Sequence, residues 1–310
     1  MYNPAMSKRI CEGLVALVTG ASQGGTGTAI AVRLAAEGAA VAITARTVSG
    51  LEETRRRVDA AGGHCLVLPV DLADPSGGRK ELVARVEADL GPLDILMNNA
   101  ETGGYRAVDE TTPESLEQNL QVNVWAPWEL MCAAVPGMRE RGRGWMLNLT
   151  TFSAELPPGP PFPTNKPAMG GFQYGGSKAM LNRLTVGAAS ECYGQGIAVN
   201  ALTPQAAIAT PSLVAGGWIN EEMFEPLDTM AEAAVALCSG DTEVLTGRIA
   251  FSLQLLLELR RPVFDLLGDQ LVEGWQPDDL RSVIDRQETN LANSGWRDAY
   301  SFGRVHSPRP

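Results

Sequence analysis

Short, almost continuous runs of apolar residues recur along most of the chain, and glycine, proline or polar residues bound each run. Strands that helices bury on both faces show this continuous apolar pattern, because neither side of the strand meets water. The sequence therefore predicts buried strands at LVALVT (14–19), AVAITA (40–45), CLVLPV (65–70), LDILMN (93–98), WMLNLT (145–150) and IAVNAL (197–202).

Stretches with helical periodicity separate these strands, near residues 27–37, 49–61, 78–90, 113–137 and 173–193. Glycine is the residue that most often ends a helix, and glycines follow four of these stretches, namely Gly38, Gly62, Gly91 and Gly194. The alternation predicts an α/β fold: a doubly wound parallel sheet of about seven strands, with right-handed crossovers and helices on both faces.

A proline-rich segment after WMLNLT is a candidate domain boundary, with prolines at Pro157, Pro158, Pro160, Pro161, Pro163 and Pro167. The alternation continues unchanged beyond it, so we expect an extended βα loop and not a linker. The alternation ends near residue 252, where LQLLLEL starts a helix that Pro262 interrupts, and residues 277–288 form a short charged helix. We predict one domain over 1–255 and a C-terminal extension over 256–310, packed on that domain or on a neighbouring subunit.

Composition and charge restrict the class of function. Hydrophobic residues make up 45% of the 310 residues, which is enough for a substantial core, and the formal net charge is −11. Such an acidic protein is not attracted to nucleic acid or to an anionic membrane, so we expect neither as a partner. The only histidines are His64 and His306, and the five cysteines are scattered, so we expect no metal site. The scattered cysteines, the lack of a signal-peptide core and the lack of a membrane-length apolar run predict a cytoplasmic protein.

A glycine-rich segment, VTGASQGGTGTAIA, joins the first predicted strand to the first predicted helix. Gly20, Gly24, Gly25 and Gly27 permit a tight turn and a close approach of the backbone to a pyrophosphate. The helix that follows offers free N–H groups and the positive end of its dipole. Glycine also marks ordinary turns, but between a first strand and a first helix it favours a nucleotide site.

The second predicted strand ends in ITARTVSG, which places Arg46 and Thr47 where the ribose of such a nucleotide is expected. A carboxylate usually binds two ribose hydroxyls at this place, whereas arginine binds a 2′-phosphate. The next acidic residue is Glu52. The pattern favours NADP(H) over NAD(H) as cofactor, and the alternative is an arginine that is simply solvated at a strand end.

The motif YGGSK places Tyr174 and Lys178 four residues apart, on one face of a helix. A phenol is a poor acid or base at neutral pH, with a reference pKa near 10. A nearby ammonium group stabilises the phenolate and so allows proton exchange with a substrate oxygen. The motif alone occurs by chance in many helices.

Here the motif belongs to an ordered series: TGASQGGTG (19–27), DLAD (71–74), NNA (98–100), QVNVWAP (121–127), NLTT (148–151), YGGSK (174–178) and VNALTP (199–204). Over residues 12–252 this series resembles the short-chain dehydrogenase/reductase family, in its NADP-preferring form. The resemblance implies a Rossmann-like fold and an NADP(H)-dependent oxidoreductase that interconverts a carbonyl and a secondary alcohol by hydride transfer. Its partners would be a small carbonyl or alcohol substrate and further copies of the chain.

The resemblance also implies catalytic roles. Tyr174 would be the general acid/base, and Lys178 would bind the nicotinamide ribose and stabilise the tyrosinate. Asn123 would anchor a water that links Lys178 to solvent, although a buried asparagine that satisfies backbone groups would look the same. The family's catalytic serine is replaced by Thr151, and Ser153 is the second candidate for its hydroxyl. Thr150 is expected to face the other side of the strand end.

For the cofactor, the resemblance implies that Asp71 and Leu72 contact adenine and that Asn99 and Ala100 line a ribose. Ile208 would meet the carboxamide through its backbone, with Thr210 nearby. The complete set expected to bind cofactor is Gly20, Ser22, Gly25, Thr26, Gly27, Arg46, Thr47, Asp71, Leu72, Asn99, Ala100, Ile208 and Thr210.

The sequence departs from the family pattern elsewhere as well. The glycine loop has one residue more than usual, Glu101 replaces a glycine after NNA, and Gln205 replaces a glycine after Pro204. Glu101 is expected near the cofactor or the pocket mouth, where it would meet a cationic or hydroxyl-rich group. These departures leave open an inactive or weakly active NADP-binding protein with a regulatory or structural role, or an isomerase or dehydratase that uses the same tyrosine.

Two further expectations concern partners. Residues 151–173 and 205–229, which include Trp218, Met223 and Phe224, would form the substrate wall. The helices at 113–137 and 173–193 resemble the pair that joins subunits in family oligomers. We therefore expect a homodimer or a homotetramer.

Overall fold

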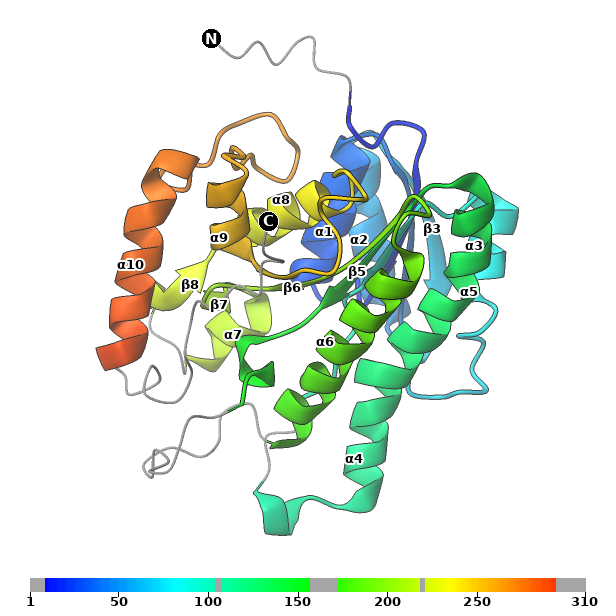
Figure 1. The fold of residues 1–310 in the computed structure, drawn as a ribbon, viewed down its shortest axis with the longest axis horizontal. Helices are drawn as coiled ribbons and strands as arrows, with labels where there is room; N and C mark the ends of the chain where they lie inside the picture. Colours follow the sequence, from blue (N-terminus) through cyan, green and yellow to red (C-terminus); the bar gives the residue numbers. More distant parts are fainter. Residues whose placement is uncertain (1–8, 104–106, 157–171, 218–220, 294–310) are drawn as a thin grey trace.

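The structure is a computed structural model that describes residues 9–103, 107–156, 172–217 and 221–293. Seven parallel strands form one sheet in the order β3-β2-β1-β4-β5-β6-β9 (Figure 1). Their bounds are β1 Val15–Thr19, β2 Ala40–Ala45, β3 His64–Pro69, β4 Ile95–Asn98, β5 Gly144–Leu149, β6 Ile197–Thr203 and β9 Ile249–Phe251. The predicted doubly wound parallel sheet is confirmed.

Helices cover both faces of the sheet because each strand is apolar on both sides. One face carries α1 (Thr26–Ala36), α2 (Val48–Ala60), α8 (Leu227–Leu237) and α9 (Ser252–Glu258), whose apolar residues share one core cluster with the sheet. The other carries α3 (Leu82–Leu90), α5 (Ala126–Arg141) and α6 (Phe172–Cys192), which share a second cluster. The shorter α4 (Pro113–Leu120) packs against α6, and α7 (Pro211–Gly216) follows β7. No helix within the described ranges is both long and apolar enough to cross a membrane.

Several boundaries differ from the predicted ones for local reasons. The helix expected from residue 78 begins at Leu82, because Gly78 has φ +88° and the Asp74 carboxylate accepts the Ser76 N–H in a preceding turn. The helix expected over 113–137 is interrupted by a π-helical turn, Gln121–Trp125, between α4 and α5. The charged C-terminal helix is longer than predicted, since α10 spans Pro277–Asn293.

The described part of the C-terminal extension packs on the domain (Figure 1). In α10, Leu280, Val283 and Ile284 are buried in the core cluster that contains α9. A buried carboxylate, Glu232 in α8, joins the extension to the first helix, because it accepts hydrogen bonds from Arg33 at 2.9 Å and from Arg261 at 2.6 Å. All five cysteines are free thiols, and Cys132 is the exposed one.

A second small sheet was not predicted. The strands β7 (Ala207–Ile208) and β8 (Phe224–Glu225) pair beside the carboxyl end of β6. The Glu225 carboxyl group is fully buried and accepts hydrogen bonds from the Ala206 N–H at 2.9 Å, the Ser252 hydroxyl at 2.7 Å and the Thr229 hydroxyl at 3.1 Å. These neutral donors favour the carboxylate, but burial outweighs them and raises the pKa of Glu225 to about 7.

We expect Glu225→Gln to remove a pH dependence of stability. The folded state holds the Glu225 proton more tightly than the unfolded chain, so its contribution is complete below about pH 4.5 and is lost as the pH rises through about 7. The difference in free energy of unfolding between variant and wild type should therefore move in favour of the variant by roughly 3 kcal/mol between pH 4.5 and 8. Urea unfolding across this range, with the exposed Glu243→Gln as control, measures the difference. A pH-independent difference would contradict the prediction.

Candidate active site

A cleft of about 230 Å³ opens at the carboxyl ends of β1, β2, β4 and β5. The strand order reverses between β1 and β4, and ligands of open parallel sheets bind where such a reversal leaves a crevice. The predicted cofactor residues line this cleft with one exception: Gly20, Ser22, Gly25, Thr26, Gly27, Arg46, Thr47, Asp71, Leu72, Asn99, Ala100 and Thr210. The exception is Ile208, which is buried in β7.

The loops after β1 and β4 are clamped together at the floor of the cleft. The Thr19 hydroxyl accepts the N–H groups of Asn99 and Ala100, both at 3.0 Å, and the Asn99 amide donates to the Thr19 carbonyl at 2.8 Å. Gly20 has φ +70°, and a Cβ there would lie 2.6 Å from the Ala100 Cα. The contact between the two loops therefore requires glycine at position 20.

The first turn of α1 faces the cleft without a capping side chain. Gly25 is its N-cap residue and provides no side-chain hydrogen bond. The backbone N–H groups of the first turn can therefore donate to a ligand. Such donors together with the positive end of the helix dipole bind phosphate groups. The residues present thus fit the pyrophosphate of a dinucleotide.

The end of the cleft beside β2 has a positive side chain. Arg46 follows β2 directly, is exposed, and forms no ion pair with another residue in the described ranges. Asp71 also lines the cleft, where its carboxylate accepts the Ala73 N–H at 2.9 Å. Within these ranges, no three His, Cys, Asp or Glu side chains are grouped so as to hold a metal ion.

The predicted catalytic pair lies on α6, beside the end of β5. Tyr174 and Lys178 are both buried, with 6% and 1% of their surface exposed. The Lys178 Nζ lies 5.8 Å from the centroid of the Tyr174 ring and donates a hydrogen bond to the Leu149 carbonyl at 2.8 Å. Burial lowers the pKa of Lys178, and the neighbouring Glu101 carboxylate opposes that shift.

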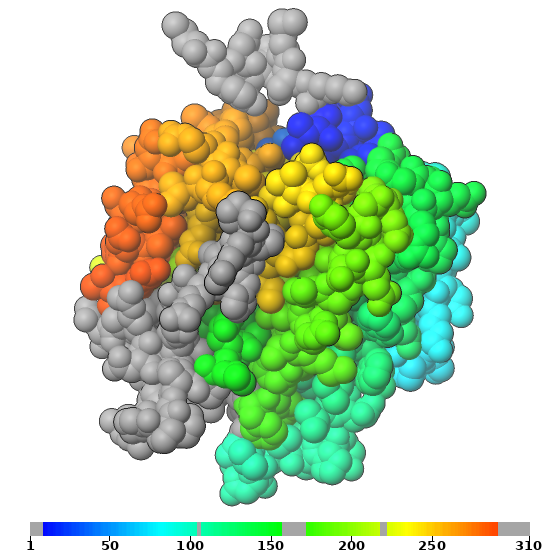
Figure 2. Space-filling model, in the orientation of Figure 1, coloured from blue at the N-terminus to red at the C-terminus, as the bar shows by residue number. Residues whose placement is uncertain are grey.

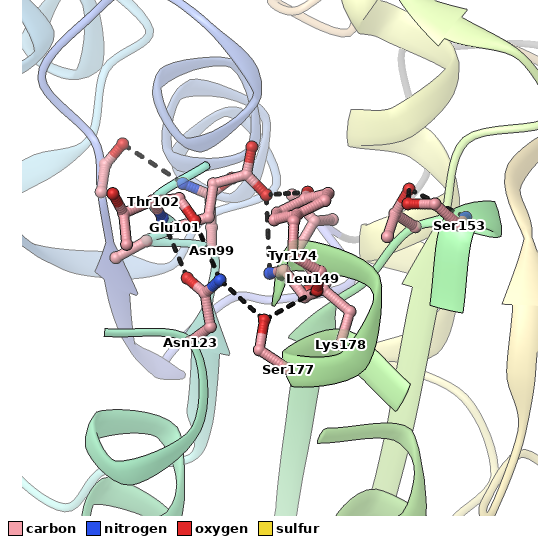
Figure 3. Close-up of polar contacts among 12 residues, drawn as sticks. Asn99, Glu101, Thr102, Asn123, Leu149, Ser153, Tyr174, Ser177 and Lys178 are labelled. Atoms are coloured by element: carbon pink, nitrogen blue, oxygen red, sulfur yellow. Dashed lines mark hydrogen bonds and ion pairs between the residues drawn. The ribbon is translucent and has the colours of Figure 1, made fainter. Parts of the chain in front are cut away.

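Glu101 comes directly after the clamped loop and reaches this pair (Figure 3). Its Oε2 accepts the Tyr174 hydroxyl at 2.7 Å and lies 3.5 Å from the Lys178 Nζ. The sequence predicts Glu101 near the cofactor or the pocket mouth, and the side chain does line the cleft. Its contact with the two residues of α6 was not predicted.

Asn123 lies in the π-helical turn and is fully buried. Its amide accepts the Thr102 N–H at 2.9 Å and donates to the Thr102 carbonyl at 3.0 Å and the Ser177 hydroxyl at 3.0 Å. Ser177 in turn donates to the Tyr174 carbonyl at 2.8 Å. Asn123 therefore joins the loop that carries Glu101 to the helix that carries Tyr174, and Ser177, which sequence reasoning missed, completes the connection.

The candidate hydroxyl groups follow β5. Thr151 begins a short 3₁₀ helix, Phe152–Ala154, and its hydroxyl lies 3.1 Å from that of Ser153. Figure 3 places Ser153 on the opposite side of Tyr174 from Glu101. Thr150 is buried, and its hydroxyl has no partner within the part of the chain that the structure describes.

Part of the predicted substrate wall lies outside the described residues. This applies to 157–171, with its prolines, and to 218–220, with Trp218. Several residues lining the cleft were not predicted, namely Gln23, Ala45, Val70, Thr102, Gln118, Val122, Leu149 and Ser212. Most are neighbours in sequence of predicted residues, so that proximity was the available signal.

The family model for short chain dehydrogenases matches residues 14–214. The chain belongs to the short-chain dehydrogenase/reductase family. A curated short chain dehydrogenase of Pseudocercospora fijiensis is 32% identical over 76% of this chain and 79% of its own length. The acetoacetyl-CoA reductase of Rhizobium meliloti is 32% identical over 75% of this chain and 94% of its own length.

Solved structures agree with this assignment. A metagenomic short-chain oxidoreductase in complex with NADP is 29% identical, covers 74% of this chain and 92% of its own, and superposes with a TM-score of 0.61. The fold and the seven-stranded sheet are thus those of the short-chain dehydrogenase/reductase family, whose members are oxidoreductases that use NAD(P).

The two candidate hydroxyls can be distinguished in this family member by kinetics. We expect Thr151→Val to lower kcat about 10- to 1,000-fold, because it removes the donor to the developing oxyanion, and Ser153→Ala to lower kcat less. Steady-state turnover of the two variants and the wild type tests the order. Full kcat in Thr151→Val with loss in Ser153→Ala would reverse the assignment.

Proposed function

We propose that this chain is an NADP(H)-dependent oxidoreductase that interconverts a carbonyl and a secondary alcohol. The observation that carries the proposal is the buried Tyr174–Lys178 pair, which contacts Glu101 and Leu149 in the lining of a cleft that the glycine loop also lines. A pure binding protein needs no phenol supported by a buried ammonium group. The reaction does need one, because a proton must be exchanged as hydride moves.

Each residue of the site contributes one step. Tyr174 donates its proton to the carbonyl oxygen during reduction and takes a proton from the alcohol during oxidation. Lys178 stabilises the tyrosinate through its positive charge. Thr151, or Ser153 in its place, donates a hydrogen bond to the same oxygen. When NADP(H) is bound, its nicotinamide supplies or accepts the hydride. Arg46, Thr47 and the glycine loop would hold the cofactor.

The preference for NADP(H) rests on two observations. Arg46 is exposed at the cleft without an ion-pair partner in the described ranges, and no carboxylate takes its place after β2. The metagenomic oxidoreductase with the same fold was solved with NADP. An arginine that is available for charge-assisted hydrogen bonds favours a 2′-phosphate.

A second candidate function is an NADP-binding protein without turnover. The observation that favours it is the Glu101 carboxylate, which occupies a hydrogen-bonding position on the Tyr174 hydroxyl. Turnover with any carbonyl or alcohol would discard this candidate.

We also propose a homo-oligomer formed through α6 and the segment of α4 and α5. These segments lie next to one another on the face shown in Figure 2. Trp125, Met180 and Val186 on them expose 40%, 42% and 39% of their surfaces. Apolar side chains in this number on neighbouring helices are typical of an interface.

The activity itself is tested with purified protein, NADPH and a panel of carbonyl compounds, and with NADP⁺ and alcohols in the reverse direction. We expect turnover, and we expect Tyr174→Phe to lower kcat/KM by about 10² to 10⁴-fold while NADPH still binds. Tyr193→Phe, which alters an exposed tyrosine directly after α6, should change neither kcat/KM nor NADPH binding. Absence of turnover in both directions would overturn the proposal.

Cofactor preference is tested at Arg46. We expect Arg46→Ala to lower kcat/KM for NADPH about 10- to 100-fold and to leave the value for NADH nearly unchanged, because only the 2′-phosphate loses its partner. Arg55→Ala, which removes an arginine of α2 that pairs with Glu52 at 2.7 Å, serves as control. Equal losses with both cofactors would contradict the assignment.

The interface is tested by light scattering. We expect the wild type to have two or four times the mass of the chain and Val186→Lys to shift it toward the monomer, since a buried ammonium is costly. Val244→Lys changes a valine that is 62% exposed and distant in sequence, and it should leave the mass unchanged. A monomeric wild type would refute the proposal.

A further inference from the structure

The Glu101 carboxylate is an unusual third member of the site. It stands 73 residues before Tyr174 in the chain, yet its Oε2 meets the Tyr174 hydroxyl at 2.7 Å and the Lys178 Nζ at 3.5 Å. Figure 3 shows the carboxylate directed at both groups. Within the described part of the chain, these two are the titratable groups in contact with it.

The position of Glu101 is fixed by its neighbours on both sides. The Thr19 hydroxyl accepts the N–H of Ala100 at 3.0 Å. On the other side, both backbone groups of Thr102 are hydrogen-bonded to Asn123, and its carbonyl also accepts the Asn119 amide at 2.8 Å. The backbone is thus held before and after Glu101, and the side chain itself is placed by its contacts with Tyr174 and Lys178.

Exposure differs sharply along this group of residues. Lys178 exposes 1% of its side chain, whereas Glu101 exposes 47% of its own. A carboxylate with this placement has one oxygen on the buried pair and the rest of the side chain in contact with water. It can therefore accept a proton inside the site and release it to solvent.

Tyr174 has different neighbours on its two sides. Glu101 lies on one side, and Ser153, with the Thr151 hydroxyl 3.1 Å from its own, lies on the other (Figure 3).

We propose that Glu101 is the immediate proton acceptor of Tyr174 and carries the reaction's proton to solvent. In alcohol oxidation, the substrate O–H bond breaks and its proton moves to the Tyr174 oxygen, while the Tyr174 proton moves to Glu101 Oε2. The hydride leaves the carbon that bears the substrate hydroxyl and passes to the bound NADP⁺. Glu101 then releases its proton to water. Reduction runs the same transfers in reverse. This inference rests on the proposed function for the substrate and on the observed contact for the transfer.

The first experiment needs no turnover. Ultraviolet difference titration of the wild type against Tyr174→Phe isolates the ionisation of Tyr174, and the same pair is measured in a Glu101→Gln background. The Glu101 carboxylate accepts a hydrogen bond from the phenol and repels the charge of a phenolate, so Glu101→Gln should lower the pKa of Tyr174. An unchanged titration would overturn the inference even if the enzyme is active.

The second experiment is the pH profile of kcat for oxidation of an alcohol with NADP⁺. We expect Glu101→Gln to lower kcat about 10- to 100-fold with little change in KM, and to change the shape of the pH profile. Glu101→Asp should restore part of the rate, because it restores the carboxylate. Glu243→Gln, which removes an exposed carboxylate that does not line the cleft, should leave kcat and the profile unchanged.

The two proposals fail in different ways. If the wild type turns over and Glu101→Gln keeps its kcat and pH profile, Glu101 is only the ion-pair partner of Lys178 and the inference is wrong. If the wild type turns over no substrate, the proposed function fails, and the tyrosine titration still decides whether Glu101 holds the Tyr174 proton.

Discussion

The buried ammonium group of Lys178 is the constraint on which the carboxyl edge of the sheet depends. Removing a charge from water costs several kcal/mol unless it gains close partners. Lys178 gains the Leu149 carbonyl at the end of β5 and the Glu101 carboxylate after β4. The carboxyl ends of two neighbouring strands and the first turns of α6 must therefore meet at the same place, and a shift of any one of them would leave the charge without compensation.

Buried polar groups beneath the site keep these elements in register. The Asn98 side-chain amide donates to the side-chain Oδ1 of Asn148, and the Asn148 side-chain N–H donates to the Thr185 hydroxyl, both at 2.8 Å, so that β4, β5 and α6 are linked in series. Glu225 in β8 is also a buried titratable group, but its burial is compensated differently from that of Lys178. Its partners are neutral donors, so burial is relieved by uptake of a proton and not by pairing with a cation.

The sequence was informative wherever a local pattern determines the structure. Continuous apolar runs located the strands of the sheet up to β6, and the order of short motifs located most of the residues that line the cleft. The contact of Glu101 with Tyr174 could not be predicted in this way, because it depends on how two loops distant in sequence meet. The π-helical turn was missed because its apolar residues continue the helical pattern, and Glu225 was missed because β7 and β8 are too short to show alternation.

The π-helical turn has a consequence for how this chain can change in length. A π turn holds one residue more than the α-helical turn it replaces, and so it sets the rotation of α5 relative to α4. Before the turn, the Asn119 amide donates a hydrogen bond to the Thr102 carbonyl. After it, Leu130 and Met131 are buried in the core. Loss of a single residue here would turn α5 by about 100° relative to α4. The Asn119 contact and the packing of Leu130 and Met131 could then not both be kept. Insertions and deletions in the π-helical turn should therefore disrupt the fold, even where substitutions of single side chains are tolerated.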